Sequence, residues 1–213
     1  MKIALIGGTG FVGTALREEL LQRGHTVTAL ARDPAKVPPH DHLQVVRADA
    51  TDAAQVADAV RGVDAVVSAY NPGWQDPAIY DHFLQGSRAI LDGVRRSGVT
   101  RVVVVGGAGS LFVAPGVQAV DTPGFPDAWK QGALAARDLL TEIRSEQALD
   151  WTFVSPAALL EPGPRTGRFR LGTEQMLMDG DHPAKLSVAD LAVAIVDELE
   201  APKHVKQRFT AAY

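Results

Sequence analysis

The sequence predicts one α/β domain with a doubly wound parallel sheet. Short apolar runs alternate with amphipathic helical patterns along nearly all of its 213 residues, which is typical of βαβ units. Several runs consist almost wholly of Val, Ile and Leu, as expected where helices cover both faces of a sheet. No repeat, linker or low-complexity tract interrupts this order, so we expect a single domain.

Six of the apolar runs are predicted strands. They span Lys2–Ile6, Thr26–Ala31, Leu43–Arg47, Ala65–Ser68, Arg101–Val105 and Trp151–Ser155. Helical periodicity predicts helices over Phe11–Arg23, Ile79–Ser97, Ala128–Ser145 and Val188–Leu199. Gly24 and Gly98 can end the first two helices in the left-handed conformation. N-caps with an acceptor three residues later are expected at two places, Asp52 with Gln55 and Ser187 with Asp190.

Two long segments rich in Gly and Pro, 106–127 and 156–172, follow predicted strands. In an open parallel sheet, ligands bind at the carboxyl ends of the strands. Loops of this length in a compact domain are usually functional or mobile. We therefore expect these two loops to form the substrate side of a site.

The composition narrows the classes of partner. A formal net charge of -4 gives no global field that favours nucleic acid or an anionic membrane. The absence of cysteine excludes disulfides, thiolate nucleophiles and cysteine-bound zinc, and makes the cytoplasm the expected compartment. The apolar stretches at 1–16 and 102–120 contain too many glycines for a signal peptide or a membrane helix. We expect a small-molecule partner, with no nucleic acid and no membrane, and leave monomer and homodimer both open.

The strongest motif is GGTGFVG at residues 7–13, between the first strand and the first helix. Gly7 permits a tight turn, Gly10 lets the backbone approach a pyrophosphate, and Gly13 lets helix and strand pack closely. The helix N-terminus then offers free N–H groups and a positive dipole end to the phosphates. This context predicts a Rossmann-type dinucleotide site. Its members are Gly7, Thr9, Gly10, Phe11, Val12 and Gly13.

Arg32 follows the second strand, about 20 residues beyond the glycine turn, where NAD-binding domains usually carry an acid for the ribose 2′-hydroxyl. An Arg at this place accommodates a 2′-phosphate, and its planar guanidinium can stack on adenine. Asp33 could instead hold the ribose hydroxyls, or could only start the turn at Pro34. The sequence favours NADP(H) over NAD.

Together with ARDP at 31–34, ADATD at 48–52 and SAYNP at 68–72, the glycine motif resembles the atypical short-chain dehydrogenases/reductases. Within them the chain is similar to the small NAD(P)H-binding group known as NADH-flavin reductases, akin to biliverdin reductase B. GGAGSL at 106–111 and RTGRFRLG at 165–172 extend the likeness, which covers nearly the whole chain. The resemblance implies a nicotinamide cofactor and oxidoreductase chemistry.

The resemblance also implies further cofactor residues, all at the carboxyl ends of predicted strands. They are Asp49 and Ala50 at the adenine, Ser68, Ala69 and Tyr70 beside the ribose and phosphates, and Ser155, Pro156 and Ala157 at the nicotinamide end. Asp49 could instead cap a helix, although Asp52 fills that role. Tyr70 could equally be a packed loop aromatic.

The Tyr-x-x-x-Lys pair, with which most short-chain dehydrogenases reduce carbonyls, is missing. Tyr70, Tyr80 and Tyr213 have no Lys four residues on, and the expected place holds the segment 127–130, which has a Lys but no Tyr. Reduction of a flavin or quinone requires less of the protein, because the acceptor needs to be oriented against the nicotinamide and can take its proton from water. Ser110 and Tyr70 are the candidate catalytic residues, although Ser110 could merely bond its own loop backbone.

Other features have structural explanations. His40 and His42 have no carboxylate pair nearby, so no metal site is expected. Trp151 and Phe153 alternate as core residues of a strand. The segment 197–200 is expected to be an exposed helix end. Three cations could meet an acidic acceptor such as a flavin phosphate, or could form a solvated face. They are Arg165, Arg168 and Arg170.

These observations favour an NADP(H)-dependent oxidoreductase that transfers hydride to a small planar acceptor such as a flavin or quinone. The alternative is a non-catalytic NADP(H)-sensing regulatory protein of the same superfamily. A sugar epimerase is a weaker alternative, because the chain lacks the Tyr–Lys pair and a separate C-terminal substrate region.

Overall fold

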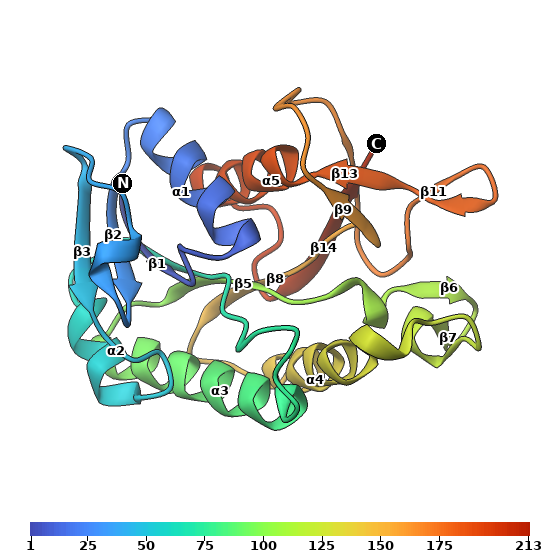
Figure 1. Ribbon diagram of the computed structural model, residues 1–213, viewed down its shortest axis with the longest axis horizontal. Helices are drawn as coiled ribbons and strands as arrows, with labels where there is room; N and C mark the ends of the chain where they lie inside the picture. The colour runs from blue at the N-terminus through green and yellow to red at the C-terminus, as the bar shows by residue number, and fades with distance from the viewer.

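The computed structural model describes residues 1–213 and contains an eight-stranded sheet between two layers of helices (Figure 1). The strand order is β10-β14-β8-β5-β4-β1-β2-β3. All neighbours are parallel except β10 and β14, which are antiparallel. The strands are β1 (Lys2–Ile6), β2 (Thr26–Ala31), β3 (Leu43–Arg47), β4 (Ala65–Ser68), β5 (Arg101–Val105), β8 (Asp150–Ser155), β10 (Arg170–Gly172) and β14 (Gln207–Ala212). The predicted doubly wound sheet is confirmed.

All six predicted strands are present, and only β8 begins one residue earlier than expected. The sequence does not predict the outer strands β14 and β10. β14 reads QRFTAA, which contains no Val, Ile or Leu and begins with two polar residues. It therefore lacks the apolar run on which strand prediction depends. Even so, five of its six residues are buried, among them Arg208.

Helices cover both faces of the sheet. Figure 1 shows α1 (Phe11–Gln22) and α5 (Val188–Glu200) on one face, and α2 (Ala53–Ala59), α3 (Ile79–Ser97) and α4 (Asp127–Ile143) on the other. Each face has its own apolar core. Gly98 ends α3 in the left-handed conformation, with φ of 83°, as predicted. No helix combines the length and apolar composition that a membrane crossing requires.

The two predicted N-caps form, but in neither does the third residue accept a hydrogen bond from the N–H of the cap. Asp52 accepts hydrogen bonds from the start of α2, and the Gln55 side chain also donates to it, at 2.8 Å. Ser187 caps α5 by accepting from the Asp190 N–H at 3.0 Å. The Asp190 carboxylate does not return to Ser187. It accepts instead from the N–H groups of Thr166 and Gly167, both at 2.8 Å, and so anchors the loop before β10 to α5.

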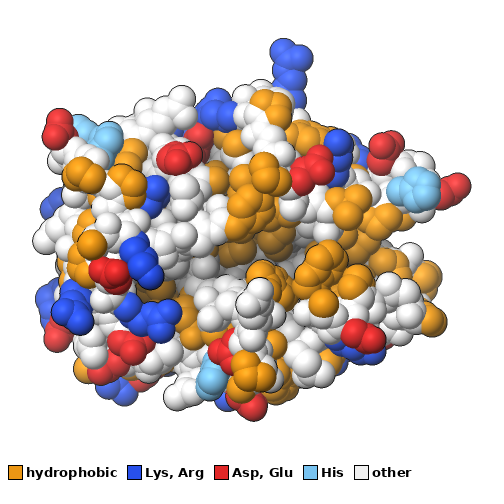
Figure 2. All heavy atoms as spheres, in the orientation of Figure 1, with side chains coloured by type: hydrophobic (Ala, Val, Ile, Leu, Met, Phe, Trp, Pro, Cys, Tyr) orange, Lys and Arg blue, Asp and Glu red, His pale blue; other side chains and the backbone are white.

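The long loops contain regular structure. The segment 106–127 forms a 3₁₀ turn at Ala108–Ser110, the hairpin of β6 (Phe112–Ala114) and β7 (Val117–Gln118), and a second 3₁₀ turn at Ala119–Asp121. Beyond β8, β9 (Leu159–Glu161) pairs in parallel with β13 (Lys185–Ser187), and β11 (Met178–Asp179) forms a hairpin with β12 (His182–Pro183). In Figure 2 hydrophobic side chains gather over these elements, beside a hollow near the middle of the face.

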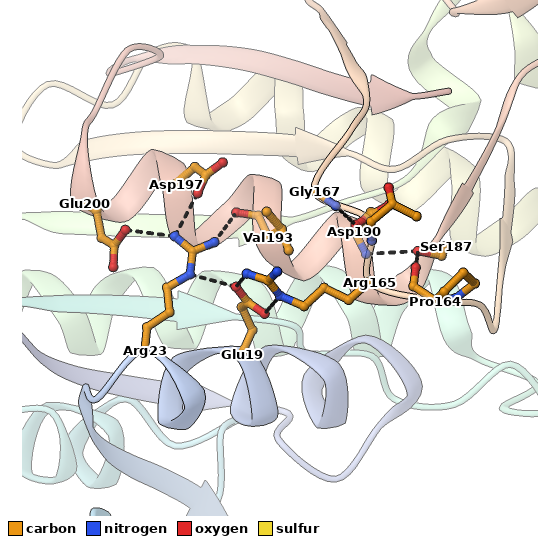
Figure 3. A network of polar contacts seen from close by, with 11 residues as sticks. Glu19, Arg23, Pro164, Arg165, Gly167, Ser187, Asp190, Val193, Asp197 and Glu200 are labelled. Atoms are coloured by element: carbon orange, nitrogen blue, oxygen red, sulfur yellow. Dashed lines mark hydrogen bonds and ion pairs between the residues drawn. The ribbon is translucent and has the colours of Figure 1, made fainter.

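A network of ion pairs joins α1 to α5 (Figure 3). The buried Glu19 of α1 accepts from Arg165 at 2.7 and 2.9 Å and from Arg23 at 2.6 Å. Arg23 also donates to Asp197 and Glu200 of α5 at 2.7 and 2.8 Å. Arg165 belongs to the loop after β9. The network therefore ties this loop to the helix that follows the glycine turn.

The expectation that 197–200 is only an exposed helix end is wrong for Glu198, whose side chain is 4% exposed. Its carboxylate accepts from the N–H groups of Lys203 and His204, at 3.1 and 2.9 Å, and from Nη2 of Arg101 at 3.1 Å. Burial alone would raise the pKa of Glu198, but the hydrogen bonds from His204 and Lys203 outweigh it and hold the pKa below its usual value. The carboxylate thus accepts hydrogen bonds from backbone N–H groups between α5 and β14 that have no partner within a helix or strand.

We predict that Glu198→Gln lowers the free energy of unfolding by about 3 kcal/mol at pH 7, because it leaves the guanidinium of Arg101 buried without its counter-charge. A group whose pKa is lowered by folding stabilises the protein above its unfolded pKa, so the difference should shrink as the pH falls below about 4.3. Urea unfolding of the native chain and the variant measures both effects. Glu161→Gln, at an exposed pair with Lys185, is the control and should have a much smaller effect. Equal losses in the two variants would refute the assignment.

Candidate functional site

The glycine turn after β1 lies in close contact with the chain that leaves β4. Gly7 has a left-handed φ of 81°, and a Cβ on it would lie 2.4 Å from the carbonyl oxygen of Ala69. A Cβ on Gly13 would lie 2.0 Å from the carbonyl oxygen of Gly7. Arg17 of α1 stabilises the turn by donating a hydrogen bond to the Gly8 carbonyl oxygen at 3.0 Å. The sequence does not single out Arg17, because a lone Arg in a helix carries no motif.

Gly10 differs from these two glycines. It is the N-cap of α1 and has extended backbone, and a Cβ on it would meet only the Gly7 carbonyl oxygen, at an ordinary 3.4 Å. No side chain caps α1, so its first-turn N–H groups have no partner from a capping residue. A shallow depression of about 350 Å³ opens beside them. Its walls are Thr9, Gly10, Phe11, Thr14, Ala15, Glu18 and Val188. The turn can therefore receive an anion without rearranging.

Arg32 is exposed at the carboxyl end of β2 and pairs with no carboxylate. Asp49, after β3, accepts from the N–H and hydroxyl of Thr51 at 2.9 and 2.8 Å. These bonds lower the pKa of Asp49, and the nearby charge of Arg32 lowers it further. Asp33 is engaged locally, since it accepts from the Ala35 N–H at 3.2 Å and so starts a 3₁₀ turn. Two exposed cations at this end of the edge lack a carboxylate partner, Arg32 after β2 and Arg47 at the end of β3.

Tyr70 packs against α3. Its hydroxyl donates to the His82 carbonyl at 3.2 Å, and its ring lies where a Cβ on Gly86 would be only 2.4 Å away. Burial raises the pKa of Tyr70, and the charge of Arg32 opposes this rise. The structure therefore favours the packed loop aromatic, and a catalytic role for Tyr70 gains no support from it. Before it in the chain, Ser68 is buried and Ala69 touches the glycine turn.

Ser110 is 1% exposed, and its environment is one that the sequence does not predict. Arg208 of β14 donates to the Ser110 hydroxyl at 2.9 Å and to its carbonyl at 3.1 Å. The same guanidinium pairs with Glu174, which also binds Arg144 at 2.8 Å. Arg208 thus joins the loop after β5 to the segment after β10. The role of Ser110 as an anchor for an acceptor gains no support from this buried position.

Ser155 ends β8 and is fully buried, yet its hydroxyl has no hydrogen-bond partner. Pro156 and Ala157 follow and are buried as well. An unpaired polar group inside a protein is costly, so such a group at a strand end marks a place where a ligand can supply the missing partner. Any signal in the sequence is weak, because a Ser at the end of an apolar run is common.

These groups follow one another along the carboxyl edge of the sheet. Arg32 follows β2, the glycine turn follows β1, Ala69 follows β4, and Ser155 ends β8. Four strand spacings separate β2 from β8, roughly 19 Å. The strand order reverses at β1 and β4, the switch point where open α/β sheets bind nucleotides. The uncapped N-terminus of α1, the unpaired guanidinium of Arg32 and the unpaired hydroxyl of Ser155 fit a phosphorylated dinucleotide bound along this edge.

Two of the three arginines considered for an acidic acceptor are already occupied. Arg165 holds Glu19, and Arg170 donates to the carbonyl oxygens of Tyr213 and Met178. Arg168 is exposed and has no carboxylate partner. The solvated-face interpretation therefore fits better than a cluster poised for phosphate.

The chain is similar to known proteins in both sequence and fold. The pattern of a family described as NAD(P)H-binding matches residues 7–200. The chain is 35% identical to the uncharacterised protein YwnB of Bacillus subtilis, over 99% of this chain and 97% of that protein. A "putative epimerase" from Bacteroides thetaiotaomicron superposes with a TM-score of 0.93 at 44% identity, covering 100% of this chain and 96% of that one. For a "putative NADH-flavin reductase" from Streptococcus pneumoniae the TM-score is 0.84 at 33% identity, covering 100% and 99%.

The family pattern runs from the glycine turn to the end of α5 and so includes most of the edge described above. The solved relatives have the same fold over the full length of this chain. In agreement with its resemblance to the atypical short-chain dehydrogenases/reductases, the chain belongs to the NAD(P)H-binding family.

Proposed function

We propose that the chain is an NADP(H)-dependent reductase that passes hydride to a small planar acceptor, such as a flavin or quinone. The observation that carries the proposal is the row of polar groups without a protein partner along one sheet edge, from Arg32 past the uncapped α1 to Ser155. The likeness to a protein called an NADH-flavin reductase supports the choice of reaction.

The residues along the edge have distinct tasks in this proposal. The first-turn N–H groups of α1 and its dipole hold the pyrophosphate, and Gly10 leaves the room for it. Arg32 binds the 2′-phosphate. Ser155 offers its unpaired hydroxyl at the other end of the edge, where Pro156 and Ala157 exclude water. When bound there, the nicotinamide supplies the hydride.

Neither of the two candidate catalytic side chains is free to act as a proton donor on the acceptor side. The hydroxyl of Tyr70 is engaged with α3 and that of Ser110 with Arg208, and the chain has no Tyr-x-x-x-Lys pair. This arrangement suits an acceptor whose proton comes from water, so orientation and exclusion of solvent supply the catalysis. It also suits a non-catalytic NADP(H) sensor, the alternative function. Oxidation of NADPH by FMN, riboflavin or a small quinone separates the two, because a sensor binds NADPH without turnover.

We predict that Gly10→Val weakens NADPH binding at least tenfold while leaving the unfolding free energy nearly unchanged. The extended backbone at Gly10 admits any residue, so the new side chain would only occupy the space of the pyrophosphate. Gly13→Ala should instead lower the stability itself, because its Cβ would collide with the Gly7 carbonyl. Titration calorimetry and urea unfolding measure the two effects. Unchanged NADPH affinity in Gly10→Val would refute the phosphate site.

We predict that Arg32→Ala weakens NADPH by about 1.5–3 kcal/mol, the usual worth of a hydrogen bond to a charged group, and NADH much less. Dissociation constants for both cofactors test this. Arg61→Ala is the matched control, because Arg61 is an exposed Arg that lies outside the proposed site. Equal losses for NADPH and NADH would mean that Arg32 only stacks or packs.

We predict that Tyr70→Phe and Ser110→Ala each lower kcat less than tenfold, with NADPH affinity retained. An essential proton donor typically contributes 10²–10⁴-fold, so the two outcomes are distinguishable. Steady-state NADPH oxidation with FMN and with a small quinone provides the measurement. A collapse of kcat in either variant would reveal a dedicated acid and favour carbonyl reduction.

A further inference from the structure

The exposed hydrophobic side chains of the chain are not spread evenly. Ten large hydrophobic side chains are exposed, and seven of them belong to the segments that follow β4, β5 and β8 at the carboxyl edge, beyond the glycine turn. They are Trp74, Val113, Val117, Trp129, Leu159, Leu171 and Met178. Clusters of this kind on a soluble fold mark binding surfaces. We call these seven residues the apolar rim.

The two tryptophans lie on neighbouring segments at the start of α4. The ring of Trp74, 57% exposed, lies where a Cβ on Gly132 would be only 2.9 Å from it. Trp129, 51% exposed, stands in the first turn of the same helix. The hairpin of β6 and β7 carries Val113 and Val117. Figure 2 shows hydrophobic side chains gathered over these elements and, across the hollow, over β9 and β11.

Several of the charged side chains around the apolar rim are engaged within the protein. Arg170 is held by backbone carbonyls, Lys185 pairs with Glu161 at 3.1 Å, and Glu174 pairs with Arg144 and Arg208. Near the rim two cations, Lys130 and Arg168, lack a carboxylate partner, and two exposed acids of the β11–β12 hairpin, Asp179 and Asp181, lack a cation partner. Lys130 shares the first turn of α4 with Asp127, and Arg168 follows the segment that lies over α5 (Figure 3).

The rim therefore offers aromatic and aliphatic surface without a cluster of free cations. We propose that the acceptor is an uncharged planar molecule of the quinone type, bound by the apolar rim, and not a phosphate-bearing flavin. This inference rests on the proposed reductase function and names its substrate class. The reaction balances without a further reactant: NADPH gives up a hydride, the quinone takes it with one proton from water, and NADP⁺ and quinol leave.

Riboflavin and FMN form a matched pair, because they differ only in the phosphate. The proposal predicts that kcat/KM for riboflavin equals or exceeds that for FMN, and that a small neutral 1,4-quinone is the best of the three. Trp129→Ala should raise the KM for the quinone at least fivefold and leave NADPH affinity unchanged. Val205→Ala, which removes exposed apolar surface before β14 and so at the opposite edge, should change neither value.

Binding is measured without turnover through tryptophan fluorescence. The quinone should quench the exposed Trp74 and Trp129, and the double variant Trp74→Phe/Trp129→Phe, which keeps only the buried Trp151, should lose most of this quenching. An FMN preference of tenfold or more, lost in Lys130→Ala or Arg168→Ala, would overturn the proposal, and so would quenching that persists in the double variant. Saturable quenching without any NADPH oxidation would preserve the apolar site and refute the reductase function instead.

Discussion

The close packing of the glycine turn against the chain leaving β4 is the constraint on which the rest of the edge depends. β1 and β4 are neighbours whose onward connections run to opposite sides of the sheet, so their carboxyl ends leave an opening. Gly7 and Gly13 lie too close to backbone oxygens to carry a Cβ. α1 begins directly after this turn, and its uncapped N-terminus therefore lies at the carboxyl edge of the sheet, beside the opening.

Polar side chains along this edge divide into two groups. Tyr70, Ser110 and Asp49 have their partners within the protein and hold loops in place. Arg32 and Ser155 have no such partner, although Ser155 is fully buried. Retaining an unsatisfied buried hydroxyl costs stability, and a bound ligand offsets that cost. The proposed cofactor site is therefore outlined by Arg32 and Ser155, which have no protein partner, and not by the candidate catalytic residues Tyr70 and Ser110.

Local signals account for what the sequence predicts. Continuous apolar runs identify β1 to β5 and β8, and the glycine pattern with Arg32 predicts the proposed cofactor edge. Long-range polar contacts account for what it misses. The buried Arg208 makes β14 look polar in sequence, and its partner Ser110 lies 98 residues away. In the sequence, Glu198 is one acid in a run that is expected to be exposed. Only in the fold does the chain after α5 lie against its carboxylate. No spacing rule encodes such pairs.

A crystal structure of the chain grown with NADP⁺ tests the central claim most directly. The account predicts pyrophosphate oxygens within about 3.2 Å of the N–H groups after Gly10, and the 2′-phosphate within the same distance of the Arg32 guanidinium. It also predicts a nicotinamide carboxamide or ribose that bonds the Ser155 hydroxyl. A nucleotide bound with its pyrophosphate away from the glycine turn, or with Ser155 still unpaired, would contradict it.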